Sequence, residues 1–241
     1  MLRIEQISPK IWAIFGENPP DAAKAFVRFQ EYYENVLLKG KKGLVVRDIE
    51  DWWEQYRDKD EKELYYAFWQ GFNVPGTVIL DLVRTSEFRP GFSVEQFLAK
   101  PTRYPRWHNA ETELLKLLES LTIDQINNGY FIGMWQGSTD VLEHEVAHAF
   151  YATIPSYKAE QTLNIGELQH DVYDQFHTQL IELGYHRDIV LDEMQAYMST
   201  YPETLSDHFN SDVDFDTDTY LAHTPPFVAT FQRYRNPFTP S

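Results

Sequence analysis

The chain has 241 residues, a formal net charge of −16 and no cysteine. The negative charge argues against nucleic acid and anionic membrane surfaces as partners, because both are bound by clustered Lys and Arg. The lack of cysteine excludes disulfides and thiolate metal ligands, so a transition-metal site must use His and carboxylate. Neither an apolar leader nor an apolar run of about 18 residues is present, so we expect a cytoplasmic protein that does not span a membrane.

The first part of the chain, residues 1–137, is predicted to be an α+β subdomain with a small sheet. Short apolar runs favour strands over 10–15, 44–46, 64–72 and 130–135. Helical spacing of apolar residues predicts helices over 19–38, 48–56, 73–83, 94–99 and 110–121. The helix over 73–83 is expected to begin at the sequence Asn-Val-Pro at 73–75.

The second part, residues 138–241, is predicted to be mainly helical. Helices are expected over 140–153, 166–183 and 188–200, and Phe227, Phe231 and Tyr234 indicate a last short helix. Pro155 should end the first of these helices, because the residue before a proline is disfavoured in the helical region. The stretch 206–226 is acidic and is expected to be irregular.

The sequence H-E-x-x-H occurs at residues 144–148, on the predicted helix 140–153. Residues four apart lie on the same face of a helix, so His144 and His148 can direct their ring nitrogens at one metal ion. Glu145 can then reach a metal-activated water without binding the metal, as a general base does.

A catalytic zinc usually has a third protein ligand and one open position. Glu193 is the best candidate, because it lies on the later helix 188–200 and is followed by Ala196, which permits close packing. Tyr197 lies one turn beyond Glu193 and could form a hydrogen bond with one of the metal ligands. A rival set, on one face of helix 166–183, comprises His170, Asp174 and His177, for which a polar solvent face is the simpler interpretation.

An H-E-x-x-H helix followed by E-x-x-A-Y on a later helix resembles the gluzincin group of zinc metallopeptidases, to which thermolysin belongs. The resemblance covers residues 140–200 and extends to bacterial proteins that carry the same paired motif. It implies a zincin-like fold, one Zn²⁺ ion on His144, His148 and Glu193, and Glu145 as the base. It also implies a peptide or protein substrate. Thermolysin-like enzymes have an acidic residue where this chain has Tyr197.

The residues and the resemblance together predict a zinc-dependent hydrolase, in which Glu145 takes a proton from the zinc-activated water. His186 or Tyr197 would stabilise the oxyanion, with Tyr185 and Tyr151 as competitors for that role. The alternatives are a hydrolase of small amides and a non-catalytic metal-binding scaffold, which a fourth protein ligand such as His170 or His177 would support.

Two further groups of charged residues receive structural interpretations. The alternating acids Asp212, Asp214, Asp216 and Asp218 lack the glycine and the final glutamate of a calcium loop, so a solvated acidic loop is expected. Arg233 and Arg235 are interpreted as forming surface ion pairs, although they could bind a substrate carboxylate.

Overall fold

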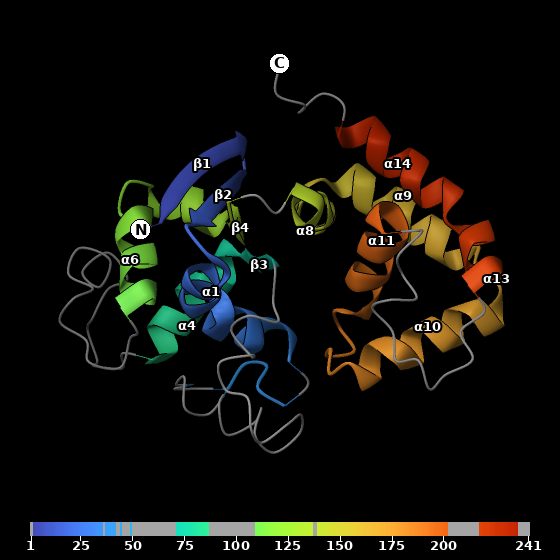
Figure 1. Ribbon diagram of the computed structural model, residues 1–241, viewed down its shortest axis with the longest axis horizontal. Helices are drawn as coiled ribbons and strands as arrows, with labels where there is room; N and C mark the ends of the chain where they lie inside the picture. Colours follow the sequence, from blue (N-terminus) through green and yellow to red (C-terminus); the bar gives the residue numbers. More distant parts are fainter. Residues whose placement is uncertain are drawn as a thin grey trace. The chain divides into compact units, whose positions relative to one another are not determined.

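The computed structural model describes residues 2–35, 37–41, 44, 49, 71–86, 109–136, 139–201 and 217–235. The chain divides into two compact units, Met1–Leu142 and Glu143–Ser241, which are described separately (Figure 1). The predicted α+β composition is confirmed: one small sheet is accompanied by a larger number of helices. Every helix among the described residues is too short or too polar to cross a bilayer.

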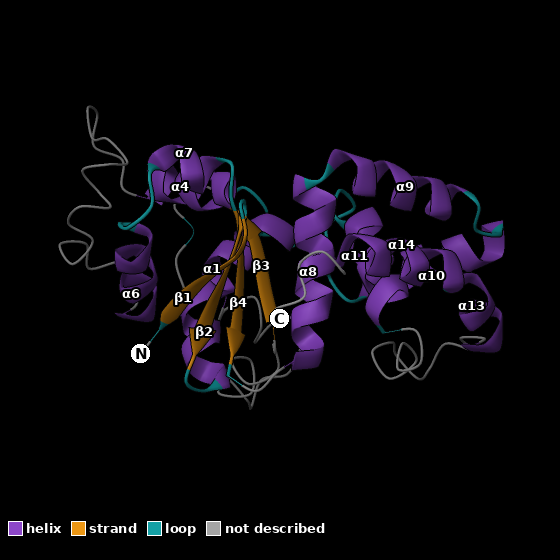
Figure 2. Ribbon diagram, turned by 90° about the horizontal axis from the view of Figure 1, so that it is seen from above, coloured by secondary structure: helices purple, strands orange, loops and turns teal. Residues whose placement is uncertain are grey.

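The first unit contains a four-stranded sheet of order β1-β2-β4-β3 (Figure 2). The strands are β1 (Arg3–Ser8), β2 (Ile11–Gly16), β3 (Gly71–Pro75) and β4 (Tyr130–Trp135). The central strands β2 and β4 run parallel, and each pairs with an antiparallel edge strand. Both central strands are almost entirely buried, which explains their continuous apolar sequences.

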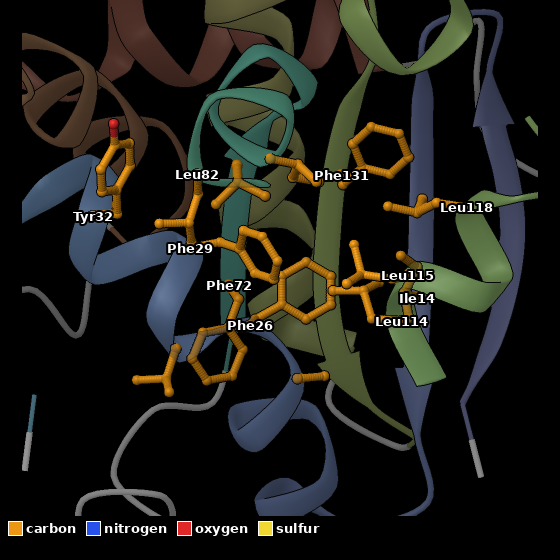
Figure 3. Close-up of a cluster of buried hydrophobic side chains, with 14 of the residues drawn as sticks. Ile14, Phe26, Phe29, Tyr32, Phe72, Leu82, Leu114, Leu115, Leu118 and Phe131 are labelled. Carbon is orange, nitrogen blue, oxygen red and sulfur yellow. The ribbon is translucent and has the colours of Figure 1, made fainter. Parts of the chain in front are cut away.

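Helix α1 (Pro19–Glu34) packs against this sheet and against α4 (Gly76–Ser86) and α6 (Asn109–Leu118); α7 (Ile123–Asn127) contacts α4. Figure 3 shows side chains from α1, β3, β4 and α6 meeting in one apolar core. Gly133 of β4 permits the closest approach, because a Cβ atom at that position would lie 2.4 Å from the ring of Phe26.

One buried ion pair joins α1 to α6 inside this core. Arg28 donates from Nε to Oε1 of Glu111 at 2.5 Å and from its terminal nitrogen to Oε2 at 2.8 Å. Both side chains are completely buried. Removal of one partner therefore leaves a charge without its counterion in a medium of low polarity.

We expect Glu111→Leu to lower the free energy of unfolding of this unit by about 3–5 kcal/mol, because Arg28 remains buried and charged. The double variant Arg28→Met/Glu111→Leu should recover most of that loss, since an apolar pair needs no counterion. Urea unfolding of the three proteins measures both effects. A double variant no more stable than Glu111→Leu would contradict the assignment of the cost to the unpaired arginine.

The second unit is helical. Its elements are α8 (Thr139–Thr153), in which the division between the units falls, α9 (Pro155–Gly166), α10 (His170–Glu182), α11 (Val190–Thr200), α13 (Thr217–His223) and α14 (Pro225–Arg235). Helix α11 packs against α9, α10 and α14. A separate apolar core, which includes Phe176, Met194 and Phe227, lies among α10, α11 and α14.

Several element predictions are confirmed and others are wrong. The strand over 130–135 and the helix over 140–153 are confirmed, and the last helix is α14. Residues 73–75 end a strand, and the helix begins only at Gly76. Pro155 ends α8 but also occupies the first turn of α9, a helix that was not predicted.

Other element predictions were inexact or lie outside the described residues. The predicted helix over 166–183 begins only at His170, and α13 lies within the stretch expected to be irregular. The predicted strand 44–46 and the predicted helices 48–56 and 94–99 fall mostly or wholly outside the described residues, as does most of the strand 64–72.

Candidate metal centre

Helix α8 presents the two motif histidines on one face. His144 and His148 are 7% and 1% exposed, and their Nε2 atoms lie 3.2 Å apart. The helix ends at Thr153 because Ile154, which precedes Pro155, is extended. The 3.6-residue helical period thus places two imidazole nitrogens at one buried point.

Helix α11 lies beside α8 within the second unit and supplies the third side chain (Figure 1). Glu193 is 1% exposed, and its Oε1 lies 3.6 Å from Nε2 of His148. Its Oε2 lies 3.9 Å from Nε2 of His144 and has no hydrogen-bond partner in the described part of the chain. The three predicted ligands therefore converge on one point, although His144 and Glu193 lie 49 residues apart in the sequence.

These three residues form the group that could hold a metal ion, with one ligand atom from each and all within 4.8 Å of one another. Ligand atoms at about 2.0–2.1 Å from a tetrahedral zinc ion lie about 3.3 Å apart. The two Nε2 atoms, 3.2 Å apart, match that value, while the two oxygens of Glu193 each face one ring, at 3.6 Å from His148 and 3.9 Å from His144. Small side-chain rotations would make the distances equal, so the donor set fits a small divalent cation.

The hydrogen bonds of the two rings determine which nitrogen carries the proton in each neutral imidazole. Nδ1 of His148 donates to Oδ1 of Asp192 at 2.9 Å, because a carboxylate can only accept. Nδ1 of His144 lies 3.2 Å from Oγ1 of Thr200, whose only proton is donated to the carbonyl of Ala196. Oγ1 therefore accepts from His144, and both Nε2 lone pairs face the same point.

Facing lone pairs repel unless a positive charge lies between them. Burial lowers the pKa of His148, but the charges of Glu193, Asp192 and Glu145 and the hydrogen bond to Asp192 together raise it well above its ordinary value. Burial raises the pKa of Glu193 to about 8, opposed by the charge of His148. Three carboxylates surround the two rings, so the electrostatics of this point favour a cation.

Glu145 belongs to the same cluster but not to the ligand group. It is 5% exposed and follows His144 on α8. Its charge raises the pKa of His148, Glu193 and Tyr197, which places its carboxylate among those groups. A carboxylate beside the candidate ligand group could accept a proton from a molecule bound there.

Aromatic residues enclose His144. The ring centroid of Tyr197 lies 4.7 Å from that of His144, and Tyr201 stacks on the imidazole at 5.0 Å. Burial and the charge of Glu193 raise the pKa of Tyr197, so its hydroxyl stays protonated and can donate. Tyr185 forms side-chain hydrogen bonds with both Glu193 and Tyr197. Tyr185 thus contacts a candidate ligand directly.

Other predicted oxyanion donors have different partners. Nδ1 of His186 lies 3.4 Å from Oδ2 of Asp188 and accepts from the Asp188 backbone at 3.2 Å. Tyr151 contacts Thr162 and the ammonium group of Lys158. The described partner of His186 is thus Asp188, which is not a candidate ligand.

The rival ligand set is not part of this group. The side chain of His170 is 90% exposed and pairs with Asp174 one turn along α10, as expected for a polar solvent face. His177 lies next to the ring of Tyr173. Within the described residues, the candidate group has three members and no fourth protein ligand.

The two arginines near the C-terminus, Arg233 and Arg235, form ion pairs with side chains of the same unit, as was expected from the sequence. Arg235 donates from Nε to both carboxylate oxygens of Glu143 at 3.1 Å. Arg233 pairs with Glu160, which also accepts from Tyr234. Most of the acidic stretch that begins at Asp212 lies outside the described residues.

Sequence reasoning missed the residues that orient the two histidines. Asp192 is adjacent to Glu193, and Thr200 lies two turns further along α11, so both were visible on the predicted helix. Only the packing of α11 on α8 shows that each one contacts an imidazole Nδ1. An acidic residue beside the candidate ligand was the one available signal.

Comparison of the chain with known protein families, curated proteins and solved structures finds no match. The buried group His144, His148 and Glu193 could hold a metal ion and is the feature of this chain that bears on its function.

Proposed function

We propose that this chain is a zinc-dependent hydrolase that cleaves peptide bonds. The observation that carries the proposal is the convergence of two imidazole Nε2 atoms, 3.2 Å apart, with a buried carboxylate from another helix. Two nitrogens and one oxygen, with no thiolate, match the His₂Glu donor set of hydrolytic zinc sites. Because the group has three protein ligands among the described residues, a coordination position would remain for substrate or water.

Bound zinc would act as a Lewis acid toward a carbonyl oxygen and make a water molecule more acidic. The side chains supply the proton transfers. The Glu145 carboxylate accepts a proton from the attacking water and returns it to the nitrogen of the leaving amine. Asp192 and Thr200 hold the rings of His148 and His144 in the orientation that directs both Nε2 atoms at the cation.

The oxyanion that forms on the substrate carbonyl also needs a hydrogen-bond donor. Tyr197 is best placed, because its ring lies against His144 and the charges of Glu193 and Glu145 both affect its hydroxyl. His186 remains a predicted donor, although its described partner is Asp188. A Tyr197→Phe variant that keeps full turnover would transfer this role to another residue.

The alternative of a non-catalytic metal scaffold has a clear discriminator. A structural zinc site is usually closed by four protein ligands, whereas three were found here among the described residues. The exposed position of His170 also removes one of the two residues suggested as a fourth ligand. The count of ligands therefore supports the catalytic reading.

The test begins with elemental analysis of the full-length protein and continues with a mixture of peptides whose cleavage is followed by mass spectrometry. We expect about one zinc ion per chain and cleavage that stops when a chelator removes the metal and resumes when zinc is restored. Stoichiometric zinc with no cleavage of any peptide would favour the scaffold. Cleavage restricted to small amides would show that the protein is a hydrolase but that peptides are not its substrates.

A further inference from the structure

A chain of buried polar side chains leads away from His148 across three helices. Beyond Asp192, the Nε2 amide group of Gln195 donates to Oδ1 of Asp192 at 3.1 Å. The hydroxyl of Tyr157 donates to Oε1 of Gln195 at 2.8 Å. The Nε2 amide group of Gln161 in turn donates to the Tyr157 hydroxyl at 3.0 Å. These contacts join α8, α11 and α9.

The other end of this series of hydrogen bonds, at Gln161, is also held in place. The Gln161 amide contacts Oγ of Ser199 at 3.0 Å and the backbone carbonyl of Phe227 at 3.3 Å, and its Oε1 accepts from Asn164 at 2.9 Å. Gln161 and Gln195 are fully buried, as is Tyr157. Buried polar groups of this kind are costly unless all are satisfied, and here each has partners.

The direction of every hydrogen bond follows from one fact: a carboxylate only accepts. Gln195 must therefore turn its amide nitrogen toward Asp192, which leaves its oxygen facing Tyr157. The Tyr157 hydroxyl must donate to that oxygen, so its lone pair accepts from Gln161. All the donors are aligned toward Asp192, and successive bonds of one direction strengthen one another.

We propose that Gln195, Tyr157 and Gln161 are positioning residues for the metal centre. They fix the Asp192 carboxylate, which fixes the ring of His148 and directs its Nε2 atom at the cation. This proposal rests on metal binding at the group His144, His148 and Glu193, and it does not depend on hydrolysis. Its consequence is that single oxygen or nitrogen atoms distant from the metal control how tightly the metal is held.

The variants Gln195→Met and Tyr157→Phe test the proposal, because each removes the polar group and largely keeps the shape. Tyr220→Phe is the matched control: it removes another buried phenolic oxygen of the same unit, and that residue is not in the chain of bonds to Asp192. Zinc affinity is measured for the full-length protein by competition with a chromophoric chelator. Thermal unfolding of the metal-free proteins shows that each variant is folded.

We expect Gln195→Met to weaken zinc binding by up to about 10-fold, the lower end of the range for direct partners of a metal-bound histidine, because Gln195 acts through Asp192; Tyr157→Phe should weaken it less. The control should bind as the wild type does. Adding Tyr157→Phe to Asp192→Ala should cost no further affinity, because Asp192→Ala removes the oxygen that accepts from both His148 and Gln195. The absorption bands of bound Co²⁺ should shift in Gln195→Met and remain unchanged in Tyr220→Phe.

Wild-type zinc affinity in both Gln195→Met and Tyr157→Phe would overturn the proposal, as would an equal loss in Tyr220→Phe. A fully additive loss in the Asp192→Ala background would also overturn it, since the residues would then act by another route. If the wild type binds no zinc, this inference and the proposed function both fail. Tight zinc binding without peptide cleavage would contradict only the proposed hydrolase.

Discussion

Replacement of Glu145 by Gln should abolish peptide cleavage and leave the zinc content of the protein unchanged. Glu145 lies among the candidate ligands but is not one of them, so metal binding does not require its charge. The amide has nearly the same shape as the carboxylate but cannot accept a proton from water. General acid–base catalysis contributes roughly 10²–10⁴-fold, and we expect a loss of turnover in that range.

Glu143 provides the matched control for this variant. It precedes Glu145 by two residues on the same helix, and its carboxylate pairs with Arg235. Glu143→Gln should therefore lose only the partly buried ion pair with Arg235 and retain both zinc and turnover. Turnover and metal content are measured on the same preparations. Wild-type turnover in Glu145→Gln would remove the proposed mechanism, and loss of zinc would show that Glu145 acts as a ligand or holds one.

The parts of the fold that could be predicted are those encoded by neighbouring residues. Strand β4 was predicted with its full range because a continuous apolar run follows the turn at Asn128 and Gly129. Helix α9 was missed because a proline can both end one helix and begin the next. Whether a new helix follows Pro155 depends on the packing of the residues after it, which the local sequence does not give. The strand order was beyond prediction, since β2 and β4 pair across more than 110 residues of intervening sequence.

The candidate site divides in the same way. The spacing of His144 and His148 is a local property of one helix, and it was sufficient to predict two converging nitrogens. Glu193 could be suggested because it lies on a distinct later helix. The orienting partners Asp192 and Thr200 could not be assigned, because their role depends on which face of α11 packs on α8. The chain of bonds through Tyr157 depends on the unpredicted helix α9.

Zinc should stabilise the wild-type protein strongly, and Glu193→Gln should remove that response. A ligand that binds only the folded state stabilises it by about 2.7 kcal/mol when present at a hundred times its dissociation constant. The charges of Asp192 and Glu145, which raise the pKa of Glu193, also attract a cation and so favour zinc binding. Glutamine offers only a neutral oxygen, so the zinc-dependent rise in unfolding temperature should largely disappear.

The same substitution should hardly change the metal-free protein. Burial raises the pKa of Glu193 to about 8, so its charged form is disfavoured without metal and the neutral amide should be tolerated there. Thermal unfolding with and without zinc measures both effects, with the exposed Glu167→Gln as control. An equal response to zinc in Glu193→Gln and in the wild type would exclude Glu193 as a ligand. A large loss of stability in the metal-free variant would instead assign Glu193 a structural role, because a carboxylate held mainly for a cation contributes little to the fold in its absence.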